Sequence, residues 1–299
     1  LGTRLFQRTT RQLTLTETGE GYFKRVVDIL SLIAEAEDFV SRRNTKPRGV
    51  LKVTAPTAFS RLHIAPYLPQ FLAKYPEIEL DFHLTDSYVD IIRDGFDLAV
   101  RIGELRDSSL VQRKLAADRR VICASPKYIE TFGAPTSLAE LDFHNCLSAG
   151  AQDFWRLQGP DGHHQLKVKG NIRSNSLEFI REALLAGLGI GLRSTWDIGP
   201  ELESGALTVL LPDYTGADTV AIHAVYPCRD FMPEKVNVFI EFLSEIYGNE
   251  PYWNQRINID LLLKPACAIA ESAVAKKVSP ASPRSKRRPA SPRPPDASM

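Results

Sequence analysis

The sequence holds few cysteines for its 299 residues, and those few are far apart. Cys123, Cys146, Cys228 and Cys267 form no CxxC pair and no cluster with histidine, which excludes the usual zinc spacings and a disulfide framework. We interpret them as buried thiols of a reducing compartment.

Long apolar runs are also lacking. No stretch approaches the roughly 20 apolar residues of a membrane span, and no basic segment followed by an apolar run resembles a signal peptide. The expectation is a cytoplasmic protein with no membrane partner.

Motifs of the common enzyme classes are absent, since GxSxG, HExxH and the Walker loop do not occur. Gly187, Gly189 and Gly191 in "GLGIGL" follow a helical pattern rather than a strand, which argues against a dinucleotide loop. His163 and His164 lie in a polar turn. We therefore predict no catalytic residue, no bound metal and no cofactor, and a protein that is not an enzyme.

An excess of one charge is lacking as well, because the formal net charge is +1. Residues 264–299 carry +6 of it, which leaves −5 for the rest, so any nucleic-acid surface has to be local. The tail contains "KKVSPASPRSKRRPASPRPPDASM", which has almost nothing to bury, and we predict a disordered basic, Pro/Ser-rich tail over residues 254–299.

The N-terminal residues predict a ribbon followed by a helix. Residues 3–15 alternate apolar and polar side chains on either side of a polar tip, and a two-stranded ribbon needs something to pack on. Apolar residues then recur every 3.5 residues on average, at Tyr22, Val26, Ile29, Ile33, Ala36 and Val40. This seam either covers a core or pairs with a second copy of the chain, and we favour the second copy because little chain precedes it.

The middle of the chain predicts a parallel sheet. Strand patterns "GVLKVTAP", "IELDFHLTD" and "FDLAVRIG" alternate with a helix over 58–75 and a short helix that stops at Gly95. Ligands of such sheets bind at the carboxyl ends of the strands. Those ends are rich in hydroxyl groups and carry Arg101.

A second set of strands and helices follows, and the chain then returns to the style of the first. "RRVICASP" and "TVAIHAVYP" mark predicted crossings between two α/β lobes, near 122–127 and 219–226. Between them, a helix starts near "SLEFIREALL", with Asn175 as its predicted cap and Glu178 at the capping-box spacing.

Several segments in this order resemble the LysR-type transcriptional regulators: "RLFQRTTRQLTLTETG", "GVLKVTAPTAF", "DGFDLAVRIG", "ALLAGLGIGL" and "PELESGALTVLLPDY". The resemblance covers about residues 1–248 and implies an α/β fold. It implies a two-lobed periplasmic-binding-protein-like effector domain, preceded by the remnant wing of a winged helix-turn-helix and a long linker helix. The implied segments are the wing at 1–16, the linker or dimerisation helix at 17–45, lobe I at 48–124 and 222–248, and lobe II at 125–221.

The resemblance also implies that the ribbon is a wing that contacts DNA at a promoter or operator, with the helix-turn-helix absent from this sequence. Positive charge and small hydroxyls at a wing tip suit phosphates. The DNA-binding candidates are Arg4, Arg8, Thr9, Thr10 and Arg11. A solvated basic turn is the alternative interpretation.

A small effector between the lobes is the second implied partner. The candidates are Thr57, Ala58, Phe59, Ser60, Thr85, Asp86, Arg101, Gly103, Asn175 and Ser176. A carboxylate-bearing effector suits Arg101, with a ring against Phe59. Two alternatives stay open: Arg101 pairs with Asp97 or Glu104 instead, and Asn175 only caps its helix.

The function predicted from these features is a DNA-binding transcriptional regulator that responds to a small effector, as a homodimer or homotetramer. Two alternatives stay open. One is a solute-binding protein of a transporter, which needs neither the arginine wing nor the seam helix. The other is a truncated regulator that binds effector but no specific DNA.

Overall fold

The structure is a computed structural model that describes residues 2–8, 13–23, 25–26, 29–30, 33, 46–104, 110–149, 154–227 and 232–255. The tip of the predicted wing and most of the predicted tail lie outside these residues. No helix among them is long and apolar enough to cross a membrane.

The predicted ribbon is confirmed. β1 (Phe6–Arg8) and β2 (Leu13–Leu15) pair antiparallel, and Thr16 ends the ribbon by donating its hydroxyl to the Arg4 carbonyl at 2.8 Å. The helix starts at once, since residues 17–23 are helical and Thr16 Oγ1 accepts from Gly19 N at 3.0 Å. Residues 34–45 of the predicted linker helix lie outside the described residues.

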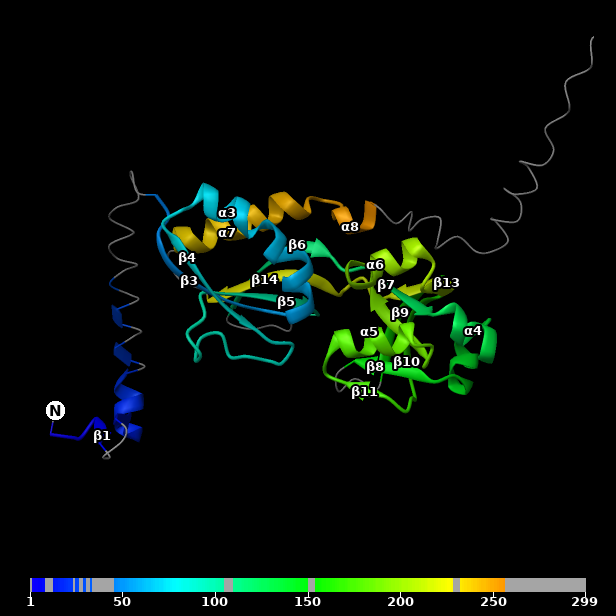
Figure 1. Cartoon of the computed structure of the whole chain (residues 1–299), viewed down its shortest axis with the longest axis horizontal. Helices are drawn as coiled ribbons and strands as arrows, with labels where there is room; N and C mark the ends of the chain where they lie inside the picture. The colour runs from blue at the N-terminus through cyan, green and yellow to red at the C-terminus, as the bar shows by residue number, and fades with distance from the viewer. Residues whose placement is uncertain are drawn as a thin grey trace, which may run out of the picture. The chain divides into compact units, whose positions relative to one another are not determined.

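Lobe I is a five-stranded sheet in the order β4-β3-β5-β14-β6, with β3 parallel to both β4 and β5 (Figure 1). The parallel strands confirm the pattern read from the sequence. The strands are β3 (Gly49–Ala55), β4 (Ile78–Leu84), β5 (Leu98–Gly103), β6 (Leu110–Ala117) and β14 (Ala221–Pro227).

The helices of lobe I pack on each other through aromatic rings. The predicted helix over 58–75 is a run of short helical types, and Phe71 from it meets Phe239 and Phe242 of α7 with ring centroids 5.0 and 5.1 Å apart. The predicted short helix before Gly95 is only a turn at 91–95. The helical elements are α2 (Thr57–Phe59), the π-helix η1 (Ser60–Ile64), the 3₁₀-helix η2 (Ala65–Tyr67), α3 (Leu68–Lys74) and α7 (Glu234–Tyr247).

Lobe II is a seven-stranded sheet in the order β10-β9-β13-β7-β12-β8-β11. Its strands are β7 (Arg120–Ala124), β8 (Cys146–Ala149), β9 (Phe154–Gly159), β10 (Gly162–Lys167), β11 (Arg173–Ser174), β12 (Ile190–Ser194) and β13 (Thr208–Gly216). Its helices are α4 (Pro126–Phe132), the 3₁₀-helix η3 (Leu138–Phe143), α5 (Leu177–Leu185) and α6 (Thr195–Ser204).

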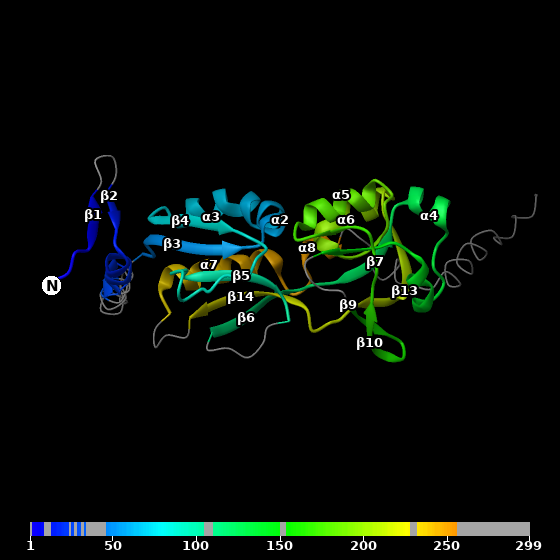
Figure 2. The ribbon, with the colours of Figure 1, turned by 90° about the horizontal axis from the view of Figure 1, so that it is seen from below.

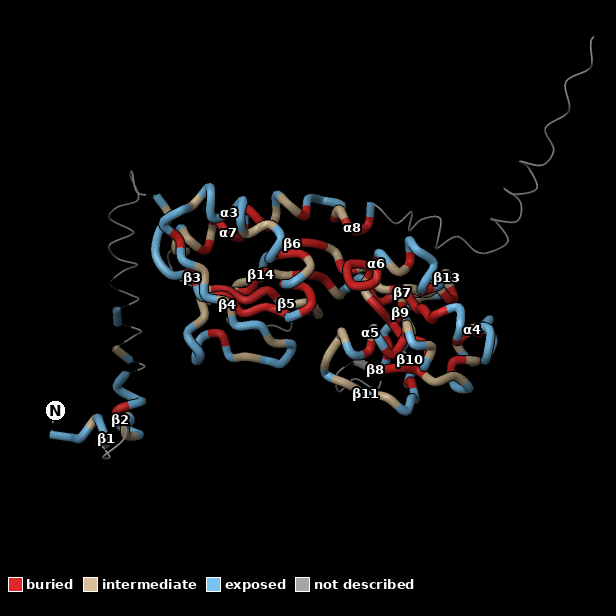
Figure 3. The backbone as a smooth tube through the Cα atoms, in the orientation of Figure 1, coloured by how far each residue is buried: buried red, intermediate tan, exposed pale blue. Residues whose placement is uncertain are grey.

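The central strands of each lobe form its core, as Figure 3 shows by their burial. The glycines of "GLGIGL" serve this packing. Gly187 has φ +82° after α5, and a Cβ on Gly189 would lie 2.3 Å from the Asn145 carbonyl oxygen. A left-handed turn therefore accounts for Gly187, and a close backbone approach accounts for Gly189.

The crossings between the lobes differ from the predicted boundaries. β7 pairs with β12 and β13 of lobe II, so the first crossing is at 118–119 and residues 120–124 belong to lobe II rather than lobe I. The second crossing runs from β13 to β14 over 217–220 and can be followed in Figure 2. After α7, the chain forms α8 (Tyr252–Gln255), so Asn254 and Gln255 are not part of a disordered tail.

Asp118 lies at the first crossing with 5% of its surface exposed. Its Oδ2 accepts from Ser194 Oγ at 3.1 Å, while its Oδ1 has no partner among the described residues. Burial raises the pKa of Asp118 to about 6, against the opposing effects of Arg120, Ser194, Trp196 and Arg193. A carboxyl group that is costly to ionise thus sits where the chain passes between the lobes.

This raised pKa predicts that Asp118 makes stability depend on pH. The folded state binds the proton more tightly than the unfolded chain, so the contribution of Asp118 is most favourable below about pH 4 and is lost as the pH rises through about 6. We expect Asp118→Asn to remove this loss, which amounts to at most about 3 kcal/mol at neutral pH. Thermal unfolding at about pH 4.5 and about pH 7.5 measures it.

Asp81→Asn, which makes the same change at an exposed carboxyl group, is the control variant. If Asp118→Asn shifted the melting temperature equally at both pH values, the carboxyl group would not titrate in this range.

Candidate effector site

The parallel pairing of β3, β4 and β5 brings three groups of predicted residues to one edge of the lobe I sheet. Thr57 N donates to Asp86 Oδ1 at 3.1 Å, which joins the segment after β3 to the segment after β4. Arg101, near the end of β5, donates through Nη2 to Thr54 Oγ1 at 3.4 Å. The strand-end residues predicted from the sequence therefore lie together.

Arg101 is half-buried at this edge and does not pair with the carboxylates named as alternatives. Asp97 pairs with Lys235 at 2.9 Å, and Glu104 pairs with Arg156 and accepts from Thr219. Both structural alternatives for Arg101 are thus wrong. Among the described residues, no carboxylate forms an ion pair with Arg101.

Burial and neighbouring acidic groups have opposite effects on the charge of Arg101. Burial lowers the pKa of its guanidinium, and the nearby Tyr88 and Asp86 oppose that shift. Tyr88 is 91% exposed and was not among the predicted residues, since a lone tyrosine in a loop gives no sequence signal.

The predicted residues after β3 differ in how they are available to a ligand. Ala58 and Phe59 are buried, and the Phe59 ring meets those of Trp196 and Trp253 at 5.2 and 6.0 Å between centroids. The expectation that an effector ring rests against Phe59 does not fit this burial. Ser60 is different, because its Oγ is buried without a hydrogen-bond partner among the described residues.

In lobe II, Ser176 and not Asn175 caps α5. Ser176 Oγ accepts from Phe179 N at 3.3 Å, which places Glu178 at the second helical position and contradicts the predicted capping box. The start of α5 is fixed by Arg193, which donates to the Leu177 carbonyl at 3.0 Å. The exposed Asn175 side chain is thereby free of the capping role that was its alternative.

An ion pair between the lobes links these two groups of residues. Arg61 Nε and Nη2 both donate to Glu178 Oε1, at 3.0 and 2.8 Å, so η1 of lobe I is tied to α5 of lobe II. Arg61 follows Ser60, and Glu178 is two residues from Ser176. The pair therefore places both candidate segments beside one contact between the lobes. The sequence contains so many charged residues that this ion pair could not be predicted from it.

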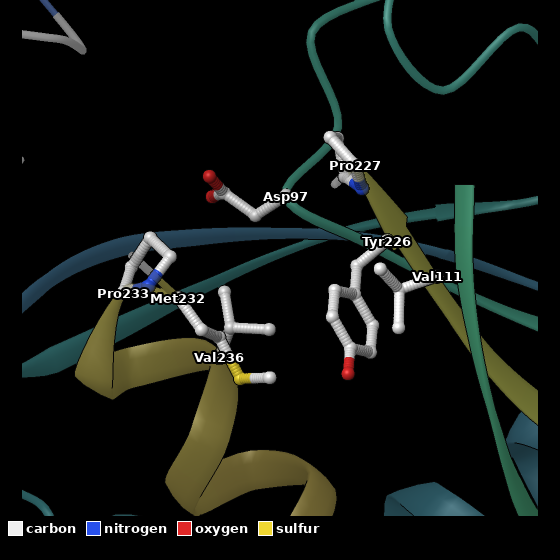
Figure 4. Close-up of a pocket in the computed structure, with 7 residues that line it drawn as sticks. All are labelled: Asp97, Val111, Tyr226, Pro227, Met232, Pro233 and Val236. Atoms are coloured by element: carbon white, nitrogen blue, oxygen red, sulfur yellow. The ribbon is translucent and has the colours of Figure 1, made fainter. Parts of the chain in front are cut away.

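Two hollows lie outside this group of residues. One, of about 210 Å³, is lined mainly by apolar side chains of lobe I with Asp97 at its edge (Figure 4): Asp97, Val111, Tyr226, Pro227, Met232, Pro233 and Val236. The other, of about 470 Å³, is open to the surface and includes His83 and Tyr88. Neither contains a predicted effector residue.

The groups that would serve metal or thiol chemistry are not assembled in the described part of the chain. No cluster of histidine, cysteine and carboxylate side chains there could hold a metal ion. Cys123 and Cys146 are free and buried, and burial raises the pKa of each thiol to about 12. These two thiols are therefore unreactive at neutral pH.

Of the predicted DNA-binding residues, Arg4 is exposed and Arg8 ends β1. Thr9, Thr10 and Arg11 lie outside the described residues. In the described part of the helix that follows, several large apolar side chains are exposed: Tyr22 45%, Phe23 57%, Ile29 55%, Leu30 59% and Ile33 50%.

Comparison with known proteins agrees with this architecture. The family described as LysR substrate binding domain matches residues 44–247. The HTH-type transcriptional activator TtdR of Escherichia coli K12 is 35% identical over 248 residues, which are 82% of this chain and 79% of TtdR. CrgA of Neisseria meningitidis, an HTH-type transcriptional regulator, is 34% identical over 83% of this chain and 84% of its own.

Solved structures show the same relationship. The structure of CrgA, a LysR-type transcriptional regulator from Neisseria meningitidis, has a TM-score of 0.61 and 33% identity over 83% of this chain and 85% of its own. The full-length Vibrio cholerae virulence activator AphB has a TM-score of 0.59 and 30% identity, covering 80% of this chain and 83% of its own. With its two α/β lobes and this extent of similarity, the chain belongs to the LysR family of transcriptional regulators, and residues 44–247 are its effector-binding domain.

Proposed function

We propose that this regulator senses a small carboxylate bound at the strand-end edge of lobe I and facing α5 of lobe II. The observation that carries the proposal is Arg101, a half-buried guanidinium that forms no ion pair with a carboxylate of the described residues. A positive charge held partly away from water gains most from an anion that can reach it.

The neighbours of Arg101 support a ligand with polar groups. Ser60 Oγ is a buried donor and acceptor without a partner in the described part of the chain. Thr85 directly follows β4, and Gly103 ends β5. Ser176 and Asn175 complete the proposed set from lobe II. Ala58 and Phe59 contribute through packing, since their side chains are buried.

Sensing requires that the effector favours one arrangement of the lobes over another. A ligand that touches both lobes binds best when they are correctly spaced, and so shifts the population toward that arrangement. In an oligomer held by the seam helix, the same shift changes the spacing of the wings. The coupling is then between effector and DNA affinity, and it is reciprocal.

The test is binding of acetate, benzoate and succinate, with acetamide, benzamide and succinamide as uncharged controls. We expect the chain to bind at least one carboxylate and not its amide, and Arg101→Gln to weaken that binding by about tenfold or more. Isothermal titration calorimetry measures it. Arg113→Gln is the matched control, because Arg113 is an exposed arginine of β6 in the same sheet. Equal affinity of Arg101→Gln and the parent chain would rule out the charge argument.

The exposed apolar side chains of residues 22–33 support pairing of two copies through the helix. Five large side chains that are each 45% exposed or more cover one helical segment, which is unfavourable in water. A second copy of the same seam is the partner that matches their spacing. The proposed state is a homodimer, and a homotetramer is a pair of such dimers.

We expect the double substitution Ile29→Glu and Ile33→Glu to halve the mass of the particle, because charges in the seam repel across a symmetric interface. Sedimentation velocity measures the mass and separates dimer from tetramer. Glu20→Gln, on an exposed polar position of the same helix, is the control. A double variant that sediments like the parent chain would place the oligomer interface elsewhere.

The proposed role of the ribbon is to contact phosphates. In a fusion behind the helix-turn-helix of Escherichia coli TtdR, we expect Arg8→Ala and Arg11→Ala to weaken binding of operator and random DNA by the same factor. Each should lower the slope of log affinity against log salt by about one. Fluorescence anisotropy over a salt series measures both effects, with Arg113→Ala as the control. A change in base preference at unchanged salt dependence would contradict the proposal.

A further inference from the structure

The short helix α8 is built into the place where the lobes meet, beyond the end of the family match at residue 247. Trp253 and Asn254 are 5% and 4% exposed. The Trp253 ring lies 4.5 Å from His63 and 5.2 Å from Tyr247, measured between centroids. Few residues of so short a helix are left to solvent, so α8 belongs to the folded domain.

A chain of hydrogen bonds runs from α8 through lobe I into lobe II. His63 of η1 is 2.6 Å from the Tyr252 hydroxyl through Nδ1 and 2.9 Å from the Trp196 carbonyl through Nε2. A carbonyl only accepts, so Nε2 carries the hydrogen and Nδ1 accepts from Tyr252. Burial lowers the pKa of His63 to about 4, so the neutral form that this arrangement needs prevails at neutral pH.

α8 is also tied directly to lobe II and to the first crossing. Asn254 Oδ1 accepts from Thr195 Oγ1 at 2.7 Å, at the start of α6. Just before α8, Glu250 pairs with Arg119 at 3.3 Å. One short segment therefore contacts both lobes and the strand connection between them.

The same place gathers buried polar atoms that have no hydrogen-bond partner. Of the eight such side-chain atoms among the described residues, five are here: Ser60 Oγ, Asp118 Oδ1, Trp196 Nε1, Trp253 Nε1 and Asn254 Nδ2. The Trp196 indole lies near enough to favour the charged form of Asp118 but makes no hydrogen bond of ordinary geometry. Unpaired buried groups are unfavourable, so these atoms lower the stability of this arrangement of the lobes.

We propose that α8 is a clasp that holds the lobes in one of two relative orientations, with Tyr252 and His63 as its positioning residues. Ser60 of the effector site and His63 of the clasp lie on the same π-helical turn, η1, and a π-helix within a longer helical run is a rare feature found mostly at functional sites. An effector that contacts Ser60 therefore lies within one helical turn of His63, which belongs to the clasp. The meaning of the clasp for regulation rests on the effector proposal above.

The test reads lobe geometry without any effector, by pulsed electron paramagnetic resonance on the full chain. Spin labels go on Glu79→Cys in lobe I and Glu130→Cys in lobe II, both exposed, in a background of Cys228→Ser and Cys267→Ser. We expect Tyr252→Phe, which keeps the ring and removes the hydroxyl, to move about fivefold more of the protein into a second inter-lobe distance. Thr195→Val, which removes the tie to Asn254, should act in the same direction.

Tyr67→Phe is the matched control, since its ring lies 5.8 Å from that of Tyr252 and its hydroxyl has no hydrogen bond among the described residues. A purely structural role of Tyr252 would lower the melting temperature and leave the distance distribution of the folded protein unchanged. If neither Tyr252→Phe nor Thr195→Val changed the distance distribution, the proposal that α8 is a clasp would be overturned. If the parent chain bound none of the carboxylates in the calorimetric test, the proposed function would be overturned. The distances between the spin labels would still test the clasp.

Discussion

Trp196 is the residue on which the contact between the two lobes depends. It belongs to α6 of lobe II, yet it is 3% exposed and packs within the hydrophobic core of lobe I. The ion pairs between the lobes are weaker ties. Arg61 and Glu178 are 61% and 45% exposed, and a pair of that kind contributes about 0–1 kcal/mol. Burial of this large ring therefore contributes more to the contact between the lobes than the exposed ion pair does.

This arrangement places the candidate site and the lobe contact on one structural element. The run from Thr57 to Ile64 begins at the strand-end edge, passes through the buried Phe59 beside Trp196, and ends at His63 against α8. A ligand at Thr57 or Ser60 therefore lies next to the residues that hold the lobes together. Coupling of binding to lobe orientation needs no long path in such a structure.

The sequence was informative wherever a local pattern determines the structure. Alternation and spacing predicted the ribbon, the parallel strands of lobe I and the gathering of Thr57, Asp86 and Arg101 at one edge, because strand order follows from the β-α-β rhythm. It failed where tertiary contacts decide. Phe59 lies between the hydroxyl residues Thr57 and Ser60 after a strand end, which favours a ligand contact. Aromatic rings from distant elements, Trp196 of lobe II and Trp253 of α8 among them, pack against it instead.

Boundaries were the other weak point, for a related reason. β7 has the composition of a buried strand in either sheet, and only its pairing with β12 and β13 assigns it to lobe II. Asn175 and Ser176 are equally good caps, and backbone geometry chooses Ser176. α8 is four residues long and stands before a stretch of low complexity, so nothing local distinguishes it from the tail. Its contacts include Phe59, His63 and Thr195, which are distant in sequence.

The balance of forces at the junction sets how strongly an effector has to act. Apolar packing of Trp196 and Trp253 favours contact between the lobes in any orientation that keeps the rings buried, whereas the hydrogen bonds of His63 and Thr195 favour one orientation only. Each such bond is worth about 0.5–1.5 kcal/mol, so the two bonds together favour that orientation by only a few kcal/mol. An effector then needs only a few kcal/mol of preferential binding to shift the population, which the proposed charge-assisted contact to Arg101 would supply together with the proposed contact to Ser60.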